Sequence, residues 1–404
     1  MRIAILTRYR RSVAGAEAYL AAVLPALSAD NNLALISDQD GDTRRPPLEL
    51  PNHSLAWSID RLGRHAVVSE LRTWRPDVIY NHGTKDAASE AAAVRLAPAV
   101  LMSHTYHGTC ISGLKTCRRP AAAPCSRRFS PACLLHYFPR RCGGCNPLTM
   151  ARLYLAERRR LRLLHEYRAV LTLSEHMRQE FLRHGVDAER VIKLPPLGFA
   201  ECTAPSPRTP LPTADRPRRF LFLGRMEHMK GGHLLIQALP LAALSLGPLH
   251  LTLAGDGPER QRWESLAGEV TTAFRNVSIE FVGGIDEAEK RRMFSQTDAL
   301  VVPSVWPEPY GLVGPEAARF GIPAVGFDVG GIREWLREGQ TGCLAPGDPP
   351  TARALAGAMV RCASNQTLLR KLAEGASEFA ASMDRNRHID KLRQILSEAA
   401  RLTP

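Results

Sequence analysis

The second half of the chain holds two glutamates whose setting suggests ligand binding. Glu308 lies in the proline-bounded loop WPEPYG, and Glu316 directly follows Pro315, a residue favoured in the first turn of a helix. We therefore expect the two carboxylates to bind different hydroxyl-bearing parts of one ligand. Gly311 and Leu312 precede the predicted helix, where unpaired backbone N–H groups can bind phosphate oxygens.

Two cations flank a turn earlier in the same half. Arg225 and Lys230 lie in GRMEHMKGG, which leads into a predicted helix at His233. Two cations near a helix N-terminus form an anion site, and a diphosphate matches their spacing and charge. For this loop alone, two solvated surface cations are the alternative. The glycine-containing loop Ala254–Pro258 is by itself equally consistent with a tight turn.

The first half supplies histidines and a glycine in loops that follow apolar runs. Gly15 begins a predicted helix and would let the backbone approach a ligand. His104 directly follows the run Val100–Met102, where we expect it to form hydrogen bonds in an active site. His82 and His107 are weaker candidates for the same role.

Taken together, these segments resemble the retaining GT-B glycosyltransferases of family 4. The resemblance is carried by Gly224, Arg225, Lys230 and Gly231, by Gly255, Asp256 and Gly257, by Glu308 and Glu316 within EPYGLVGPEA, and by GIPAVGFDVGGIREWLREGQTGCLAPGD. It implies that Arg225 and Lys230 neutralise the diphosphate of a nucleotide-sugar donor. It further implies that Glu316 binds the ribose, that Glu308 binds the transferred sugar, and that the backbone at Gly311 and Leu312 supports sugar and phosphate.

The resemblance also gives roles to residues of the first half. Gly15 lies in AGAE, which is similar to the family's GGxE segment with Ala14 in place of the first glycine. His104 falls where the family often has a His-Asp pair near the anomeric carbon, and Thr105 replaces the aspartate. The implied reaction needs no catalytic metal or other cofactor. It proceeds by front-face attack with the departing phosphate as base, so Glu308 binds and supports but is not a nucleophile.

Six cysteines lie between Cys110 and Cys145, within a segment that we place as an insertion at residues 107–147. Only Cys142 and Cys145 have the two-residue spacing of half a zinc knuckle. Three interpretations remain open: a structural zinc site, free or redox-active thiols, and structural disulfides. A zinc ion here would stabilise the fold and would not be catalytic.

Most of the net charge of +13 lies in the first half. Residues 1–200 contain 29 Lys and Arg against 17 Asp and Glu, whereas residues 201–404 contain 24 against 23. This favours an anionic partner over a merely solvated basic surface. The insertion adds aromatic and leucine side chains to seven cations, which suits a saccharide or lipid-linked acceptor and peripheral contact with an anionic membrane. Nucleic acid is the less favoured partner.

Apolar runs typical of buried strands alternate with helical patterns in both halves, which predicts parallel sheets covered by helices. The runs are Ile3–Leu6, Leu33–Ile36, Val78–Tyr80, Val100–Met102, Val170–Leu173, Phe220–Leu223, Leu249–Ala254, Ser278–Val282, Ala299–Val302 and Ala324–Phe327. We therefore expect an α/β fold with two Rossmann-like, doubly wound domains facing across a cleft. The family resemblance implies that this arrangement is the GT-B architecture.

The expected domain boundaries follow from this pattern. Residues 1–202 form an N-terminal acceptor-binding domain, residues 203–217 a proline-rich linker, and residues 218–384 a nucleotide-sugar-binding domain. Residues 385–404 form a C-terminal helix that packs back toward the N-terminal domain.

The function expected is that of a hexosyltransferase in polysaccharide biosynthesis. It moves a sugar from a nucleotide-diphosphate sugar to a lipid-linked or cell-surface saccharide intermediate. A GT-B-like sugar-nucleotide epimerase and a zinc-stapled nucleic-acid-binding protein are the alternatives. The amino terminus lacks the apolar core of a secretory signal and no apolar run is long enough to span a membrane, so we expect a cytoplasmic protein, at the inner face of the membrane where it meets lipid.

Overall fold

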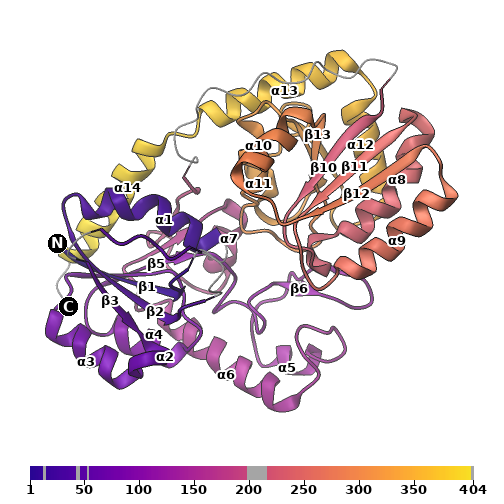
Figure 1. Ribbon diagram of the computed structural model, residues 1–404. Coiled ribbons are helices and arrows are strands. Elements are labelled where there is room, and N and C mark those ends of the chain that lie inside the picture. The colour runs from indigo at the N-terminus through magenta and orange to yellow at the C-terminus, as the bar shows by residue number, and fades with distance from the viewer. Residues whose placement is uncertain (12–14, 42–45, 52–53, 198–215, 402–404) are drawn as a thin grey trace. The chain divides into compact units, whose positions relative to one another are not determined.

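The structure is a computed structural model that describes residues 1–11, 15–41, 46–51, 54–197 and 216–401. The chain divides into two compact units, each built around a parallel sheet (Figure 1). The first unit contains residues 1–115, 126–200 and 384–404, and the second contains residues 116–125 and 201–383. The linker expected at 203–217 lies outside the described residues as far as residue 215.

The first unit has a seven-stranded sheet in the order β3-β2-β1-β4-β5-β8-β9, in which all paired strands run parallel. The strands are β1 (Arg2–Tyr9), β2 (Asn32–Gln39), β3 (Leu55–Ser58), β4 (Val78–Asn81), β5 (Ala99–Ser103), β8 (Ala169–Thr172) and β9 (Val191–Lys193). Ile3, Ala4, Ile5 and Leu6 of the central strand are fully buried, as expected for a sheet covered on both faces.

Eight helices accompany this sheet within the described residues. They are α1 (Gly15–Ser28), α2 (Ile59–Leu62), α3 (Arg64–Trp74), α4 (Ala87–Val94), α5 (Ala132–His136), α6 (Pro147–Leu163), α7 (Glu175–Arg183) and α14 (Arg385–Arg401). The last of these belongs to the C-terminal end of the chain but packs against α1, β4 and β5. Arg385 and Arg393 donate hydrogen bonds to the carbonyls of Ala22 and Ala26 on α1, which fixes α14 along that helix.

The second unit repeats the architecture with a six-stranded parallel sheet in the order β12-β11-β10-β13-β14-β15. Its strands are β10 (Arg218–Leu223), β11 (Leu249–Ala254), β12 (Val277–Gly283), β13 (Ala299–Val302), β14 (Ala324–Phe327) and β15 (Gly342–Ala345). Its helices are η1 (His228–Lys230), α8 (Gly232–Leu246), α9 (Arg260–Ala273), α10 (Glu287–Gln296), α11 (Val313–Ala318), η2 (Gly330–Glu334), α12 (Ala352–Ala363) and α13 (Gln366–Ala381). The predicted pair of parallel α/β sheets is confirmed.

The cysteine-containing insertion is divided between the two units. An antiparallel hairpin, β6 (Thr116–Cys117) and β7 (Ala123–Pro124), groups with the second unit, whereas α5 and the start of α6 group with the first. We expected the whole of residues 107–147 to belong to the first domain. Short antiparallel pairs of this kind carry no apolar period long enough to be recognised in a sequence.

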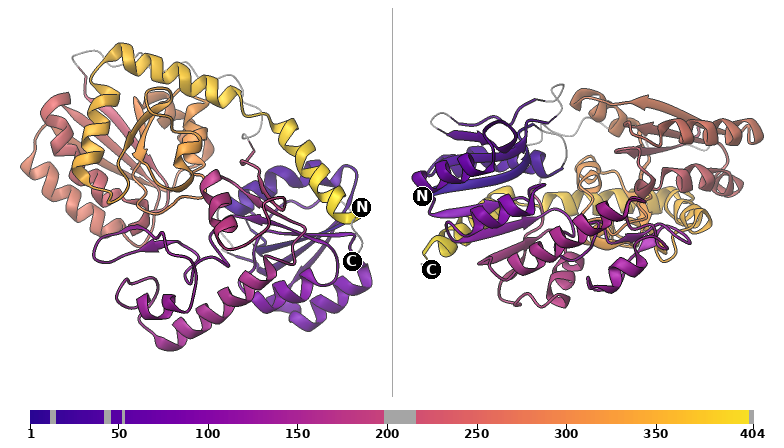
Figure 2. Two further views of the ribbon diagram at one scale, coloured as in Figure 1. Left: turned by 180° about the vertical axis from the view of Figure 1, so that it is seen from behind. Right: turned by 90° about the horizontal axis from the view of Figure 1, so that it is seen from below.

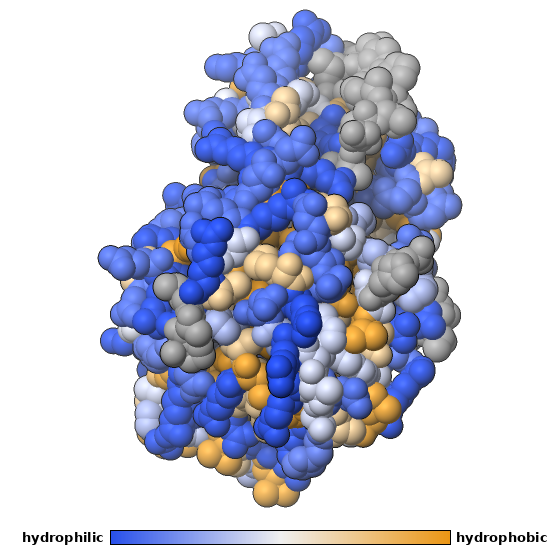
Figure 3. Space-filling view, turned by 90° about the vertical axis from the view of Figure 1, so that its left-hand side faces the viewer, coloured by the Kyte–Doolittle hydropathy of each residue, from blue (hydrophilic) through white to orange (hydrophobic). Residues whose placement is uncertain are grey.

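One side of the protein is shown as a surface in Figure 3, where hydrophilic residues predominate and hydrophobic residues form small groups between them. Within the described part of the chain, no helix combines the length and the hydrophobicity that crossing a bilayer requires. The apolar residues instead fill the two cores around the sheets.

Candidate functional site

The strongest polar contact among the predicted donor-binding residues joins Lys230 to Glu308. Lys230 ends the short helix η1, and its Nζ lies 2.6 Å from Glu308 Oε1. The same carboxylate oxygen accepts a hydrogen bond of 2.7 Å from Ser304 Oγ. Glu308 is 4% exposed, so its charge is buried but paired. Lys230 Nζ also lies 5.5 Å from the centre of the Trp306 ring, within cation–π range.

Backbone packing holds Lys230 in this position. Gly231 follows Lys230 with φ +70°, and a Cβ atom there would lie 1.8 Å from the carbonyl oxygen of Pro303. Only glycine allows the loop after β10 to approach the loop after β13 this closely. The close approach explains how two residues 78 positions apart in sequence, Lys230 and Glu308, form an ion pair.

Glu316 forms a second ion pair in the same unit. It lies in the first turn of α11, as predicted, and its Oε2 lies 3.1 Å from Lys290 Nζ on α10. Burial raises the pKa of the Glu316 carboxyl, and Lys290 offsets part of that effect. Burial also lowers the pKa of Lys290, but Glu316 and Glu287 outweigh burial and raise it overall. Lys290 was not identified from the sequence, because nothing in RRMFSQ or its flanks marks it as facing a loop.

The remaining predicted donor residues are placed differently. Arg225 is 67% exposed and pairs with Glu227, with Nε 2.8 Å from Oε1. Gly311 has φ +85°, and Leu312 is the N-cap residue of α11, so both supply backbone at a helix start, as predicted. Trp335 supports this turn by donating a 2.6 Å hydrogen bond to the carbonyl of the preceding residue, Tyr310.

The two glycine loops that follow β10 and β11 interlock. A Cβ atom on Gly255 would lie 2.0 Å from the carbonyl oxygen of Gly224, and one on Gly257 would lie 2.4 Å from that of Met226. Met226 N–H in turn donates to the carbonyl of Asp256 at 2.8 Å. The glycines of AGDGP therefore allow the two loops to pack closely, beside the predicted donor-binding residues Arg225 and Lys230.

In the first unit, His104 directly follows β5 and bonds to His82. His82 Nδ1 lies 2.9 Å from His104 Nε2, and the two rings are stacked with centroids 5.2 Å apart. Burial lowers the pKa of His104 to about 4. Burial and the neighbouring His104 lower the pKa of His82 well below its usual value, so both rings are neutral near pH 7. No described residue bonds to the buried Nε2 of His82.

A chain of hydrogen bonds passes beside this histidine pair. His388 of α14 donates from Nδ1 to the carbonyl of Pro195 at 2.9 Å, because a carbonyl can only accept. A neutral His388 therefore accepts at Nε2 from the Tyr19 hydroxyl, 2.9 Å away, and Tyr19 accepts from Tyr80 at 3.1 Å. The ring centroids of Tyr19 and His104 are 5.8 Å apart, so this series of hydrogen bonds holds Tyr19 against the predicted site residue His104.

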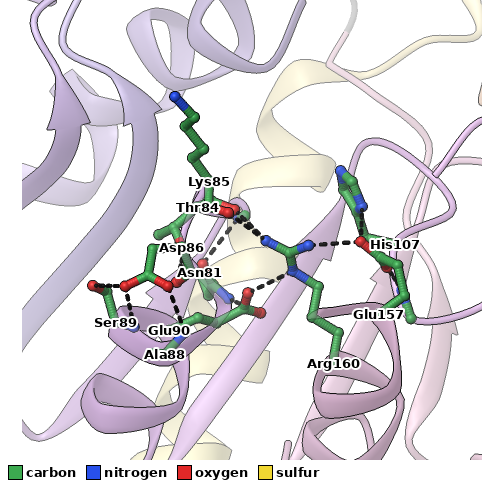
Figure 4. Close-up of polar contacts among 12 residues, drawn as sticks. Asn81, Thr84, Lys85, Asp86, Ala88, Ser89, Glu90, His107, Glu157 and Arg160 are labelled. Atoms are coloured by element: carbon green, nitrogen blue, oxygen red, sulfur yellow. Dashed lines mark hydrogen bonds and ion pairs between the residues drawn. The ribbon is translucent and has the colours of Figure 1, made fainter. Parts of the chain in front are cut away.

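Below these loops lies a buried network centred on Arg160 of α6 (Figure 4). Its guanidinium donates to Glu90 at 3.1 Å and to Glu157 at 2.7 Å, and also to the backbone carbonyls of Thr84 and Lys85. Burial lowers the pKa of Arg160, but the two glutamates outweigh it and raise the pKa. The network fixes the loop after β4 against α4 and α6.

Glu157 extends the same network to the loop after β5 (Figure 4). Its carboxylate accepts from the backbone N–H of Gly108 at 2.5 Å and lies 2.9 Å from Nδ1 of His107. His107 therefore serves to attach its loop to α6, and it is separate from the His82–His104 pair. Burial raises the pKa of Glu157, but His107 and Arg160 outweigh it and lower the pKa.

The structure thus brings some predicted residues together and leaves others in separate units. Lys230 is paired with Glu308, and His104 with His82, whereas Gly15 is the exposed first residue of α1 and Ala14 lies outside the described residues. Gly15 and His104 belong to the first unit. The second unit contains Glu308, predicted with His104 to be catalytic, and every predicted donor-binding residue except Gly15, namely Arg225, Lys230, Gly311, Leu312 and Glu316.

The cysteines of the insertion are not gathered into one cluster. The eight cysteines within the described residues are thiols and not disulfides. Among those residues, no group of three or more His, Cys, Asp or Glu side chains could hold a metal ion. Cys133 and Cys142 instead pack against a small apolar cluster of Ile111, Phe129 and Tyr137. A structural zinc ion stays a prediction, to be tested by metal analysis of the purified protein.

Two family models match the chain, one on each half. The model described as Glycosyltransferase Family 4 matches residues 13–196, and the model described as Glycosyl transferases group 1 matches residues 207–379. Together the two matches span most of the chain. They do not favour an epimerase or a nucleic-acid-binding protein.

Curated relatives match over part of their length. Glycogen synthase of Mycobacterium tuberculosis is 34% identical over 200 residues, covering 46% of this chain and 44% of that protein. Phosphatidyl-myo-inositol mannosyltransferase of Mycobacterium leprae is 32% identical over 169 residues, covering 41% of this chain and 43% of that protein. The matched segments thus span less than half the length of these relatives.

A solved structure matches over the full length. The crystal structure of Anabaena HepE in complex with UDP and glucose has a TM-score of 0.68 to this chain, covering 98% of this chain and 100% of that chain. The sequence identity is 18%, so the likeness concerns the fold.

Proposed function

We propose that this chain, which has the two-domain GT-B fold, belongs to the family 4 type of glycosyltransferases and transfers a hexosyl group from a nucleotide-diphosphate sugar to a saccharide acceptor with retention of configuration. The observation that carries the proposal is the pairing of Lys230 with Glu308 in the second unit. It joins a cation suited to phosphate with a buried carboxylate suited to sugar hydroxyls.

The donor would be bound by charges that the second unit already orients. Lys230 and Arg225 receive the diphosphate, and the backbone at Gly311 and Leu312 supports sugar and phosphate. Glu316 accepts hydrogen bonds from the ribose hydroxyls, and Lys290 holds its carboxylate in place. Because Anabaena HepE binds UDP and glucose, a uridine diphosphate sugar is the first donor to test.

The chemical step in this proposal uses no covalent bond to the protein. The acceptor hydroxyl attacks the anomeric carbon on the face from which the diphosphate leaves, and the bond between that carbon and the phosphate oxygen breaks. The acceptor proton passes to the departing phosphate. Lys230 and Arg225 stabilise the charge that develops on the leaving group, so no catalytic metal is required. Glu308 and His104 orient the transferred sugar by hydrogen bonds.

We further propose that the acceptor is a lipid-linked or cell-surface saccharide intermediate, met at the inner face of the membrane by a cytoplasmic enzyme. The support is the basic and apolar insertion at residues 107–147, which contains seven cations, five of them in the first unit. The phosphatidyl-myo-inositol mannosyltransferase among the relatives is named for a lipid acceptor, which agrees with this class of substrate.

A thermal-shift screen against uridine, guanosine and adenosine diphosphate sugars tests the donor assignment. One nucleotide class should raise the melting temperature, and the rise should persist in EDTA. Transfer to a lipid-linked saccharide, followed by NMR of the anomeric proton, then reports whether configuration is retained. Failure of every nucleotide to bind would overturn the proposal, and inversion in the product would overturn the mechanism. Turnover of donor without an acceptor would instead indicate an epimerase or a hydrolase.

A further inference from the structure

Helix α6 presents one face on which leucine and arginine alternate. Leu148, Arg152, Leu155, Arg159 and Arg162 are all exposed. At about 100° per residue these five positions fall within roughly 80° of arc, so they form a single stripe along the helix. The two leucines are 68% and 62% exposed, which is unusual for large apolar side chains.

Packing of the first unit does not require this stripe. The opposite face of α6 supplies the buried contacts: Glu157 and Arg160 enter the polar network, and Leu153 and Leu161 pack against the insertion's apolar cluster. The stripe is therefore not needed to hold α6 in place. Leucines exposed beside arginines indicate an interaction surface.

Helix α5 extends the same surface. It lies at the N-terminal end of α6, away from the first sheet (Figures 1 and 2). Leu135 on α5 is 77% exposed and Phe138, just beyond it, is 40% exposed. Arg141 follows on the exposed turn that leads out of α5.

The charge of this region has one sign. Residues 126–163 contain nine arginines and a single acidic residue, Glu157, which is 1% exposed and bonded within the unit. The stripe arginines Arg152, Arg159 and Arg162 form no ion pair with any described residue. The exposed surface of α5 and α6 therefore combines unpaired cations with apolar side chains and carries no anion.

We infer that the exposed faces of α5 and α6 form a docking surface for an anionic lipid bilayer. The proposed function supplies the reason for docking, which is to reach a lipid-linked acceptor. In that respect alone the inference rests on the proposed function. Leucine and phenylalanine side chains enter the headgroup region, and the arginines bind lipid phosphates above them. Nucleic acid would use the arginines but would leave Leu148 and Leu155 exposed to water, so it fits the surface less well.

Vesicle co-sedimentation of the full chain tests the surface without donor or acceptor. The protein should bind vesicles in which about a third of the lipid is phosphatidylglycerol, and bind phosphatidylcholine vesicles much more weakly. Exchanging both Arg152 and Arg159 for glutamate should weaken binding roughly twentyfold or more. Exchanging both Leu148 and Leu155 for serine should weaken it about tenfold at constant charge.

Matched variants on the second unit provide the controls. Arg353→Glu with Arg370→Glu makes the same change of charge on exposed positions of α12 and α13, and Leu244→Ser removes a leucine of α8 that is 82% exposed. Both should bind vesicles as the unaltered chain does. Every variant should keep its melting temperature, since all these side chains are exposed.

The inference would be wrong if both α6 variants bound vesicles as the unaltered chain does, or if the control variants lost binding equally. It would also be wrong if the chain did not bind vesicles and the same arginines were instead required for a gel shift with RNA or DNA. Dimerisation lost in the leucine variant would assign the face to a second copy of the chain instead. A thermal shift with uridine diphosphate sugar, measured on the same samples, separates this inference from the proposed function. If the chain binds the donor but does not bind vesicles, the docking surface is wrong and the proposed sugar transfer is unaffected.

Discussion

Single residues of the second unit show how the two carboxylates of the proposed donor site are held in place. Glu308 accepts bonds from Lys230 and Ser304, and Glu316 from Lys290. Each carboxylate is therefore oriented by a cation, and a donor bound as proposed would have to share Lys230 with Glu308. Sharing is favourable because a diphosphate brings the stronger charge.

The two predicted phosphate-binding cations should respond differently to mutation. Lys230→Ala and Arg225→Ala should each weaken donor binding about ten- to hundredfold, since charge-assisted bonds to phosphate contribute about 1.5–3 kcal/mol. Only Lys230→Ala should also lower the melting temperature, because it leaves Glu308 buried without its cation. Arg225 is an exposed side chain, so its loss should leave stability unchanged. Unaltered donor affinity in either folded variant would contradict the donor site.

The two glutamates should affect different kinetic constants. Glu316→Ala should mainly raise the donor KM, because ribose contacts stay the same through the reaction, whereas Glu308→Ala should mainly lower kcat, because contacts near the reacting sugar change. Steady-state kinetics at varied donor concentration distinguishes the two. Lys290→Gln should resemble a weaker Glu316→Ala, since it removes the cation that orients Glu316. If Glu316→Ala mainly lowered kcat and Glu308→Ala mainly raised the donor KM, the roles assigned to the two glutamates would have to be exchanged.

Sequence patterns located the loops of the candidate site but not the side chains that support them. Arg225, Lys230, Glu308 and Glu316 follow strands at recognisable spacings. Lys290 lies in the charged helix α10 with no mark to distinguish it. Likewise, nothing in the sequence pairs His82 with His104, because the contact depends on β4 and β5 being neighbours in the sheet. Contacts between residues far apart in sequence follow from topology, which short patterns do not encode.

At the scale of elements, α6 connects the insertion to the loops after β4 and β5. On one face of α6, Arg160 donates to the carbonyl of Thr84, and Glu157 bonds to the backbone N–H of Gly108 and to the His107 ring. The opposite face is the proposed docking surface. In this proposal α6 lies between the docking surface and the loops that carry His82 and His104. A tilt of α6 would move those loops, because Arg160 and Glu157 bond to them.

The buried arginine of that network should be essential for stability. Arg160→Met leaves the carboxylates of Glu90 and Glu157 buried with no cation, and removing one partner of such a network costs about 3–5 kcal/mol. Denaturant unfolding should show this loss. The exposed neighbour Arg158 provides the control, since Arg158→Met should change the free energy of unfolding by less than about 0.5 kcal/mol. Equal effects of the two substitutions would contradict the network's role.

Most strands of the two parallel sheets were predictable, including the edge strand β12, whereas the other edge strands were not. The run Val100–Met102 lies inside β5, and the others likewise fall on observed strands. The edge strands β3, β9 and β15 were missed, because short segments such as LAWS, VIK or GCLA carry too little apolar pattern. Helix α6 begins at Pro147 behind the N-cap Asn146, two residues favoured at the start of a helix.

At the scale of the whole molecule, buried neutral histidines link stability to pH. Burial lowers the pKa of His104, His184, His233 and His388 from an ordinary value of 6.5 to about 4. Three of these belong to the first unit and one to the second. Asp38 acts in the opposite sense, because burial raises its pKa from 3.8 to about 6. Four histidines against one such carboxyl make the histidines the larger influence.

The sign of the pH effect follows from where protons bind. Between about pH 6.5 and 4 the unfolded chain protonates these histidines and the folded chain does not, so the free energy of unfolding should fall as the pH falls through this range. Each group contributes on the order of 1–3 kcal/mol. His388→Phe should be less stable near neutral pH, because Tyr19 and Pro195 lose their bonds, yet should show a shallower fall toward acid. Urea unfolding at several pH values measures both slopes. A slope unchanged by this substitution would mean that His388 is already protonated in the folded chain, and the hydrogen-bond chain from Tyr80 through Tyr19 would then have to run in another direction.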